Sequence, residues 1–367
     1  MTPTGSCIKQ HKCAMISRYG RSDNWRGLVQ VSTTLVPLAL LWWATIACIA
    51  GSRWVPAAAA AALITLFTLR SFALMHECGH GSLFRTRALN RAVGFILGVI
   101  AGMPQYVWSR HHNYHHAHNG NWEKYRGPYT TLSVDEYAAL TTSRQRLYRH
   151  KCSIAAAPLA GFIYLVFNPR FTWIWGSAGL IRHVVGRKIA QPEIPLRDHA
   201  FTYSTRYWKS GREYWHMFWN NVVLIGALAL AAWLCGSGTF LLVYVLSLSV
   251  AGGLGIVLFT VQHNFENSYA TDTACWDHDT GAIEGTSFLV LPGWLNWFTL
   301  NIGYHHIHHL SASIPGYRLV QCHAEYQHLF PMVTRVKLSQ VHRALKCILW
   351  DARAHRIISV EEYLRQA

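Results

Sequence analysis

The feature that most constrains the fold is a run of 52 residues, from Tyr214 to Phe265, without a single Asp, Glu, Lys or Arg. About 20 apolar residues in a helix are enough to cross a lipid bilayer. Gly236-Ser237-Gly238 divides the run, which predicts two spanning helices joined by a tight turn. Soluble domains have about a quarter charged residues, whereas only 14% of this chain is charged, so we place it in the membrane class.

Two further apolar stretches lie near the N-terminus. Residues 27–52 are uncharged, and the stretch from Trp54 to Met75 is broken only by Arg70, whose side chain we expect to reach the interface. The sequence therefore predicts an all-α integral membrane protein with four transmembrane helices in two hairpins. A cytosolic helical cap is expected to carry the polar segments between and after them.

Two other apolar segments are not predicted to change this count. Ala92–Val107 has only 16 residues, several glycines and Pro104, which predicts an interfacial or partly buried helix. Residues 153–181 are interrupted by Asn168-Pro169-Arg170 and are expected to lie in the interface or to form a short hairpin.

Basic residues are distributed unevenly about the predicted helices. Lys and Arg number 5 in residues 1–26, 18 in residues 76–213 and 8 in residues 262–367, while only Arg53 lies between the first two spans. The positive-inside rule then places both termini in the cytosol, and we expect the cytoplasmic membrane of a bacterium. We predict a cytosolic N-terminal arm (1–26), a membrane domain (27–330) and a cytosolic C-terminal tail (331–367).

The net charge of +16 could also indicate nucleic-acid binding. However, the charges lie between hydrophobic spans, and the sequence has no glycine-rich phosphate loop or basic recognition helix, so no nucleic-acid partner is expected. The nine cysteines are scattered without a C-x-x-C pair, which argues against zinc-ribbon and iron–sulfur sites and for reduced thiols.

Three histidine clusters follow the predicted spans at the spacings H-x3-H, H-x2-H-H and H-x2-H-H. They are His76 and His80, then His112, His115 and His116, and finally His305, His308 and His309. Positions i, i+3 and i+4 share one face of a helix, so we expect each cluster to aim its imidazoles at one point. Eight imidazoles exceed the needs of one metal ion and, with few carboxylates nearby, favour a pair of redox irons.

A metal pair at the cytosolic mouth of a helix bundle could meet a hydrocarbon chain from the bilayer. Reduced iron with dioxygen supplies the strong oxidant that an unactivated C–H bond needs. Two alternatives remain open. His76-Glu77-Cys78-Gly79-His80 matches the H-E-x-x-H pattern of zinc metalloproteases, with Glu77 as general base. A histidine-rich metal carrier would be non-enzymatic, but it should have ionisable residues inside its spans.

The same residues resemble the membrane fatty acid desaturases. His76–Gly81, His112–His116 and His305–His309 are similar to the three histidine boxes of that family. Val261-Gln262-His263-Asn264-Phe265-Glu266 and the residues from Asn301 to Pro315 resemble delta-12-type acyl-lipid desaturases in particular. The resemblance covers about residues 30–330.

The resemblance implies an oxidoreductase that uses dioxygen and two electrons to introduce a cis double bond into a fatty acyl chain at a di-iron centre. It also implies that His263 is a ninth metal ligand. Acyl-CoA relatives place an asparagine one turn before this histidine, but here the residue is Phe259, so that ligand is not carried over. A hydroxylase or ketolase of the same superfamily is the alternative activity.

The implied partners are a fatty acyl lipid or acyl thioester and a separate ferredoxin- or cytochrome-like electron donor. The sequence contains no H-P-G-G haem motif and no flavin or nicotinamide fingerprint, so the electrons are expected to come from that donor. His111, His118 and His306 are out of phase with the boxes, and we expect them at the surface or beside the ligands.

Overall fold

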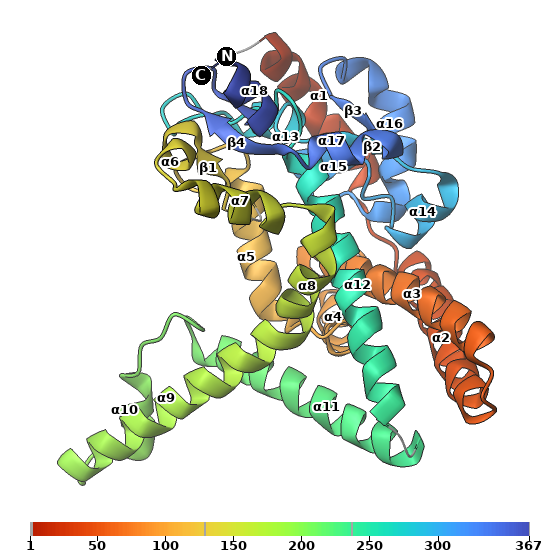
Figure 1. The fold of residues 1–367 in the computed structure, drawn as a ribbon, viewed down its shortest axis with the longest axis vertical. Coiled ribbons are helices and arrows are strands. Elements are labelled where there is room, and N and C mark those ends of the chain that lie inside the picture. Colours follow the sequence, from red (N-terminus) through yellow and green to blue (C-terminus); the bar gives the residue numbers. More distant parts are fainter. Residues whose placement is uncertain (1–2, 128–129, 236–237, 367) are drawn as a thin grey trace.

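The computed structural model describes residues 3–127, 130–235 and 238–366. Most of these residues are helical. Long helices diverge from a compact cap, and α1 and α18 both lie in that cap, at the top of Figure 1. The helices of the apolar part are α2 (Asn24–Ala50), α3 (Trp54–His80), α4 (Arg87–Ile100), α5 (Gln105–His118), α8 (Ala157–Gly161), α9 (Asn168–Ala190), α11 (Gly211–Cys235) and α12 (Gly238–His263).

Five helical segments among the described residues are long and apolar enough to cross a membrane, one more than the four transmembrane helices that we predicted, so the count of four is not confirmed. Four of them are α2, α3, α11 and α12, which match the predicted spans. The fifth is the composite segment Ile154–Ala190, which contains α8 and α9. Of the predicted turn between α11 and α12, only Gly238 lies within the described residues, where it begins α12.

The segment Ile154–Ala190 stays helical where we predicted an interruption. Pro169 lies in the first turn of α9 and has no N–H to donate to the Leu165 carbonyl, four residues earlier. The preceding residues Phe162–Phe167 form a π-helical turn, which leaves backbone carbonyls without their usual partners. The Arg170 guanidinium donates to one of these carbonyls, that of Leu165 (2.6 Å), and to the Gly102 carbonyl (2.8 Å). The arginine therefore replaces the lost hydrogen bonds and allows the helix to continue.

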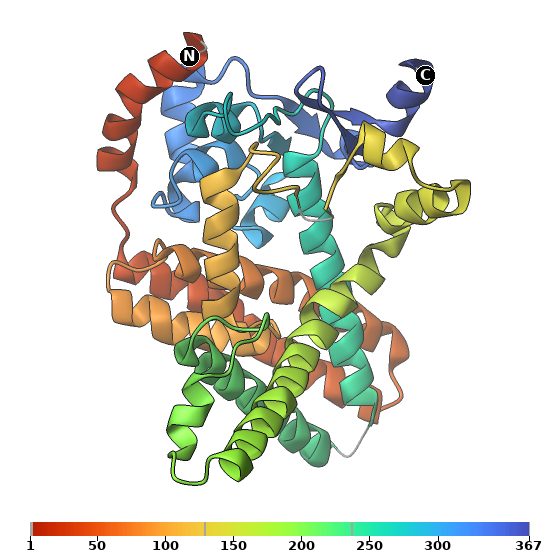
Figure 2. The same ribbon diagram turned by 90° about the vertical axis from the view of Figure 1, so that its left-hand side faces the viewer.

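The predicted single helix Ala92–Val107 is instead two helices, α4 and α5, at an angle of 101° to each other. The break falls at Ala101–Pro104, where Gly102 adopts a positive φ of 69° and Pro104 begins the next helix. α5 therefore turns out of the apolar part and rises into the cap (Figure 2). This bend places the second histidine cluster within the cap.

Arg70 is completely buried, contrary to our expectation that it would reach the interface. Its guanidinium donates to Thr34 Oγ1 (2.9 Å), Gln30 Oε1 (2.5 Å) and the Trp297 carbonyl, and lies 3.6 Å from the centre of the Trp297 ring. Oxygen acceptors and an aromatic face thus surround the cation in place of water. Arg70 thereby links α2 and α3 to α14 in the cap.

The cap contains short helices and five short strands. Among the described residues, the helices of the cap are α1 (Pro3–Tyr19), α6 (Val134–Ala138), α7 (Thr142–Lys151), α13 (His278–Ile283), α14 (Gly293–Phe298), α15 (His305–Leu310), α16 (Leu319–Tyr326), α17 (Val341–Ala344) and α18 (Val360–Gln366). Its strands are β1 (Leu132–Ser133), β2 (Phe288–Val290), β3 (Arg335–Lys337), β4 (Cys347–Asp351) and β5 (Arg356–Ser359). The short helix α10 (Leu196–Phe201) lies apart from the cap, beside α9 (Figure 1).

The residues predicted as a C-terminal tail pack into the cap. β4 lies between β1, with which it runs parallel, and β5, with which it runs antiparallel, and β2 pairs in parallel with β3. The register joins Leu349 to Leu132 on one side and to Ile358 on the other. These strands are short and come from distant parts of the chain, so hydropathy along the sequence did not predict them.

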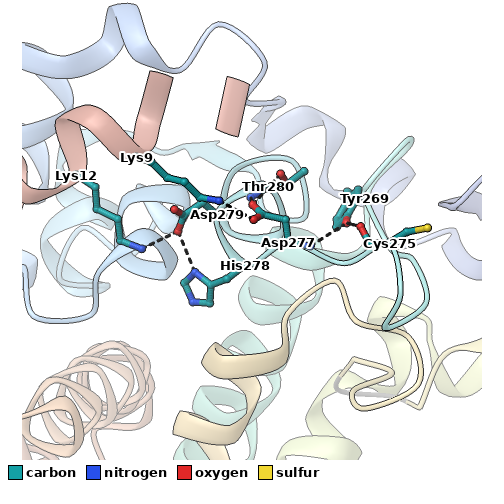
Figure 3. Close-up of polar contacts among 8 residues, drawn as sticks. All are labelled: Lys9, Lys12, Tyr269, Cys275, Asp277, His278, Asp279 and Thr280. Carbon is teal, nitrogen blue, oxygen red and sulfur yellow. Dashed lines mark hydrogen bonds and ion pairs between the residues drawn. The ribbon is translucent and has the colours of Figure 1, made fainter. Parts of the chain in front are cut away.

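The residues predicted as an N-terminal arm contain α1, which packs against the cap. Its apolar residues Ile8, Met15 and Tyr19 are buried in the same core cluster as Ile307 and Leu310 of α15. Figure 3 shows two lysines of α1 reaching α13. Lys9 pairs with Asp277 (2.9 Å) and Lys12 with Asp279 (2.6 Å). The third histidine cluster is therefore supported from the N-terminal end of the chain.

Candidate metal centre

The structure brings all nine predicted histidines together in two groups. We call the first the five-histidine group; it takes its members from α3, α5 and α15 and consists of His76, His80, His112, His116 and His308. We call the second the four-histidine group; it takes its members from α5, α12 and α15 and consists of His115, His263, His305 and His309. Within each group, the candidate ligand atoms all lie within 4.8 Å of one another.

The second and third clusters do not each aim at one point, as we expected, but divide between the two groups. On α5, His112 and His116 belong to the five-histidine group, whereas His115 belongs to the four-histidine group. α15 shows the reverse division, because His305 and His309 lie in the four-histidine group and His308 in the five-histidine group.

Helix geometry explains the division. With 3.6 residues per turn, positions i and i+4 are about 40° apart around the axis, whereas i+3 and i+4 are about 100° apart. The i and i+4 side chains of an H-x2-H-H cluster therefore point the same way and the i+3 side chain points elsewhere. One such helix supplies two ligands to one site and one ligand to its neighbour. The sites are adjacent, since the rings of His116 and His309 stack with centroids 4.1 Å apart.

The separations between imidazole nitrogens fit shared metal ions. In the five-histidine group, Nε2 of His112 lies 2.9 Å from Nε2 of His76 and 3.0 Å from Nε2 of His116. In the four-histidine group, the Nε2 atoms of His263 and His305 are 2.9 Å apart. Two nitrogens bound at right angles to one metal, with bonds of about 2.1 Å, would be about 3.0 Å apart. The residues present therefore fit a pair of metal ions.

Burial supports the same conclusion. Both ring nitrogens of His308 are buried and have no hydrogen-bond partner among the described residues. A buried polar atom without a partner destabilises the folded state, and a metal ion would remove that cost. Burial also lowers the pKa of His305, His308 and His309 well below the usual value. All three are therefore neutral at pH 7, which is the form that binds metal.

Other groups orient two of the histidines. Nδ1 of His263 lies 3.3 Å from the Gly285 carbonyl, which favours the tautomer with a proton on Nδ1 and leaves Nε2 to face the four-histidine group. Glu77 is buried and lies with Oε1 3.6 Å from Nδ1 of His76. Its Oε2 accepts hydrogen bonds from the Ser82 hydroxyl (2.9 Å) and the Gly316 N–H (2.8 Å).

These contacts argue against a zinc protease. A general base must be within reach of the water it deprotonates, but the Glu77 carboxylate is held by Ser82 and Gly316 instead. The carboxylate joins the end of the first cluster to the segment that follows the third. The H-E-x-x-H pattern alone did not indicate this role, because Gly316 is 239 residues away in the sequence. Gly81, with a φ of 73°, ends α3 directly after His80 and allows the chain to turn toward Ser82.

The out-of-phase histidines lie outside both groups. His306 is buried and contacts His323 instead, with its Nε2 3.1 Å from Nδ1 of that residue. His118 contacts the Tyr114 carbonyl and the Trp276 ring near the surface. Phe259, which stands where acyl-CoA relatives have an asparagine, packs its ring against His115 and His263. It therefore supplies an apolar wall beside the four-histidine group.

A cavity of about 400 Å³ opens beside the histidines. Five histidines and Glu77 line one end of it, the histidines being His76, His111, His112, His115 and His305. The remaining wall comes mainly from apolar residues of α3 and α12. Trp108 and Tyr164 close one side through a hydrogen bond from Trp108 Nε1 to the tyrosine hydroxyl (2.6 Å). This volume lies within the usual range for small-ligand sites, about 300–1,000 Å³, and the lining suits a hydrocarbon.

The model of the fatty acid desaturase family matches residues 52–341, which include all nine histidines. This chain belongs to the fatty acid desaturase family. A fatty acid desaturase of Bacillus subtilis (strain 168) is 29% identical over 348 residues, which cover 94% of this chain and 88% of the relative. The resemblance stated from the histidine boxes is therefore confirmed, and the chain is a desaturase-type oxidoreductase.

More distant relatives are named for related activities. An sn-1 oleoyl-lipid 12-desaturase of Picosynechococcus sp. is 23% identical over 306 residues, covering 80% of this chain and 77% of the relative. A Delta(9) fatty acid conjugase-like enzyme of Dimorphotheca sinuata is 27% identical over 254 residues, covering 68% and 63%. Together with the apolar helices, the family places this desaturase in a membrane and makes a fatty acyl chain its substrate.

Proposed function

We propose that the five-histidine and four-histidine groups each hold one iron, and that the pair oxidises an acyl chain lying in the adjacent cavity. The observation that carries this proposal is the position of the cavity, one end of which is lined by histidines of both groups. Histidine alone is compatible with iron, zinc, copper and nickel. Iron is favoured because the family reaction removes hydrogen from unactivated carbon, which needs a redox metal and dioxygen.

The proposed reaction converts two neighbouring CH2 groups of the acyl chain into a cis CH=CH unit. One O2 takes up the two hydrogens of the chain with two electrons and two protons from outside, and two water molecules leave. When bound, the iron pair supplies the oxidising power for this step. The protein holds the chain against the His112 and His115 end of the cavity, and its apolar wall keeps bulk water from that end.

The proposed substrate is a fatty acyl lipid, in keeping with the lipid-linked substrates in the names of relatives; an acyl thioester is the alternative. The two electrons are proposed to come from a separate ferredoxin- or cytochrome-like protein. This assignment rests on the sequence, which contains no haem, flavin or nicotinamide motif.

We also propose that only four of the candidate helices cross the bilayer and that the centre and both termini are cytosolic. His115 and His263 belong to one group, so the chain must cross the membrane an even number of times between them. Three candidate segments lie in this interval, namely Ile154–Ala190, α11 and α12. In Figure 1, α9 does not run in the direction shared by α2 and α3. This difference favours a position of Ile154–Ala190 in the interface, which leaves α11 and α12 as the two crossings.

The same requirement for an even number of crossings applies to the pair α4 and α5. His80 and His112 lie in one group, so this bent pair is proposed to enter the apolar part and return rather than to span it. The distribution of Lys and Arg then gives the cytosolic orientation.

The test is metal analysis of the purified protein together with gas chromatography of fatty acid methyl esters from an expressing host. We expect two irons per chain and new double bonds in host lipids. His305→Ala should abolish both the second iron and the new double bonds. His328→Ala is the matched control, since His328 is exposed and lies outside both groups.

Other outcomes would redirect the assignment. Two irons with hydroxylated or oxygenated chains in place of double bonds would indicate a hydroxylase or ketolase. One zinc per chain, with peptide cleavage that survives His305→Ala, would contradict the proposal and restore the metalloprotease alternative.

A further inference from the structure

The end of the cavity far from the histidines lies between α3 and α12. Gly255 on α12 comes eight residues before His263, so a rise of about 1.5 Å per residue places it roughly 12 Å from that histidine along the axis. Leu69 on α3 comes seven residues before His76, which by the same rise corresponds to roughly 10 Å. Both residues line the cavity, so they face it at a similar depth.

Most glycines around this end are required by helix packing. A Cβ atom on Gly253 would lie 2.6 Å from the Ala157 carbonyl oxygen, and a Cβ on Gly252 would lie 2.9 Å from Cα of Gly161. These distances are too short for any side chain, so the two glycines allow α8 to lie directly against α12. The close packing of α8 against α12 is therefore sufficient to explain why both positions are glycine.

Gly255 differs from these two glycines. Apart from its chain neighbours and its own helix backbone, a Cβ atom at this position would meet one atom of the described residues within 4 Å, Cδ1 of Leu69, at 3.8 Å. Glycine is unfavourable inside a helix, and no backbone approaches closely enough to require it here. Its missing side chain leaves open the part of the cavity between α12 and Leu69.

We propose that Gly255 and Leu69 determine how far the methyl end of the acyl chain extends from the histidines, and therefore which chain lengths are accepted. This inference rests on the proposed function, because it assumes that the cavity holds the acyl chain. A longer chain would pass between the two residues, whereas a side chain at position 255 would close that passage. Each methylene that a pocket accepts or rejects changes substrate preference by roughly ten- to two-hundredfold.

The experiment compares Gly255→Ala, Gly255→Leu and the wild-type protein on a graded series of saturated acyl chain lengths. We expect Gly255→Leu to lower desaturation of the longest accepted chain relative to shorter ones by at least about tenfold. Gly255→Ala should shift the same ratio only slightly. Gly226→Leu is the matched control, because Gly226 lies in α11 and does not line the cavity. No atom of the described residues beyond its own helix lies within 4 Å of its added Cβ.

A second substitution approaches the same place from the opposite helix. Leu69→Ala should extend the accepted length, and combining it with Gly255→Leu should partly restore the wild-type profile. If Gly255→Leu does not accumulate, Leu69→Phe narrows the passage in its place. Thermal unfolding with saturated acyl lipids of graded length gives a readout that does not need turnover, since only chains that bind stabilise the protein.

An unchanged length profile in Gly255→Leu and Leu69→Phe would overturn the inference. An equal fall at every length, with iron content retained, would also overturn it, because the passage would then not distinguish lengths. Failure of the proposed function is a different result. In that case the wild-type protein itself makes no double bond in any chain and is stabilised by none of the acyl lipids.

Discussion

The five-histidine and four-histidine groups lie side by side but differ in burial and in origin. All members of the four-histidine group are buried, whereas His80 and His116 of the five-histidine group are partly exposed. The five-histidine group takes four members from the first and second clusters, which are close in sequence. The four-histidine group takes its members from three distant segments, α5, α12 and α15, and has only one member from the first two clusters. The comparison indicates that the five-histidine group can lose one imidazole and still hold its metal ion, whereas the four-histidine group cannot.

The largest expected effect is therefore in the four-histidine group. His305→Ala leaves three imidazoles in this group, and we expect the loss of one iron. Desaturation should fall by more than about a hundredfold, which is more than the usual effect of removing a group that only orients a ligand. Iron analysis and fatty acid methyl ester chromatography measure the two effects. Retention of two irons in this variant would show that the two groups are not separate sites.

His116→Ala is expected to have a smaller effect, because four imidazoles remain in its group. We expect two irons at full loading, faster iron loss to a chelator and partial desaturation activity. The rate of iron release, compared with that of His328→Ala, measures the difference. If His116→Ala were as inactive as His305→Ala, the idea of a spare imidazole would be wrong.

Glu77→Gln tests how the five-histidine group is oriented. The amide keeps the size of the side chain but replaces the carboxylate that receives the Ser82 and Gly316 hydrogen bonds. We expect activity or iron affinity to fall by roughly 10–100-fold, the usual effect of removing an orienting partner. Glu325→Gln is the control, since Glu325 pairs with Arg18 in the cap and belongs to neither group. An equal effect of both variants would contradict an orienting role.

The smallest effect is expected from weakening the contact between α1 and α13. Because α13 packs against α15, this contact supports two members of the four-histidine group. Hydrogen bonds from His278 and Lys12 hold the pKa of Asp279 at about 2, below its ordinary value of 3.8. A carboxyl with a lowered pKa stabilises the fold above its ordinary pKa and loses that contribution as the pH falls. The wild-type protein should therefore lose stability between about pH 4 and pH 2.

Asp279→Asn should remove most of this pH dependence, and at pH 7 it should destabilise the protein by less than about 1 kcal/mol. Thermal unfolding in detergent, followed from pH 7 downward, measures both quantities. If Asp279→Asn lost stability over the same pH range as the wild-type protein, ionisable groups other than Asp279 would be responsible.

Much of this architecture could be predicted from residues that are close in sequence. Uncharged runs predicted α2, α3, α11 and α12, because a bilayer selects helices by length and apolarity alone. The clusters predicted which histidines would gather, because an i, i+3, i+4 spacing is a property of a single helix. The sequence did not predict the continuous helix through Pro169 or the burial of Arg70, since distant oxygen acceptors stabilise both guanidinium groups involved.

The sequence by itself determined the apolar helices and the eight imidazoles in three regularly spaced clusters, whereas His263 was expected only from the resemblance to the desaturases. Only the tertiary structure decided how those imidazoles divide, with His115 on one side and its neighbour His116 on the other. It also decided which glycines serve packing and which one leaves room in the cavity. The reason is physical: spacing fixes the direction of a side chain around its own helix, whereas its partners depend on where the other helices lie.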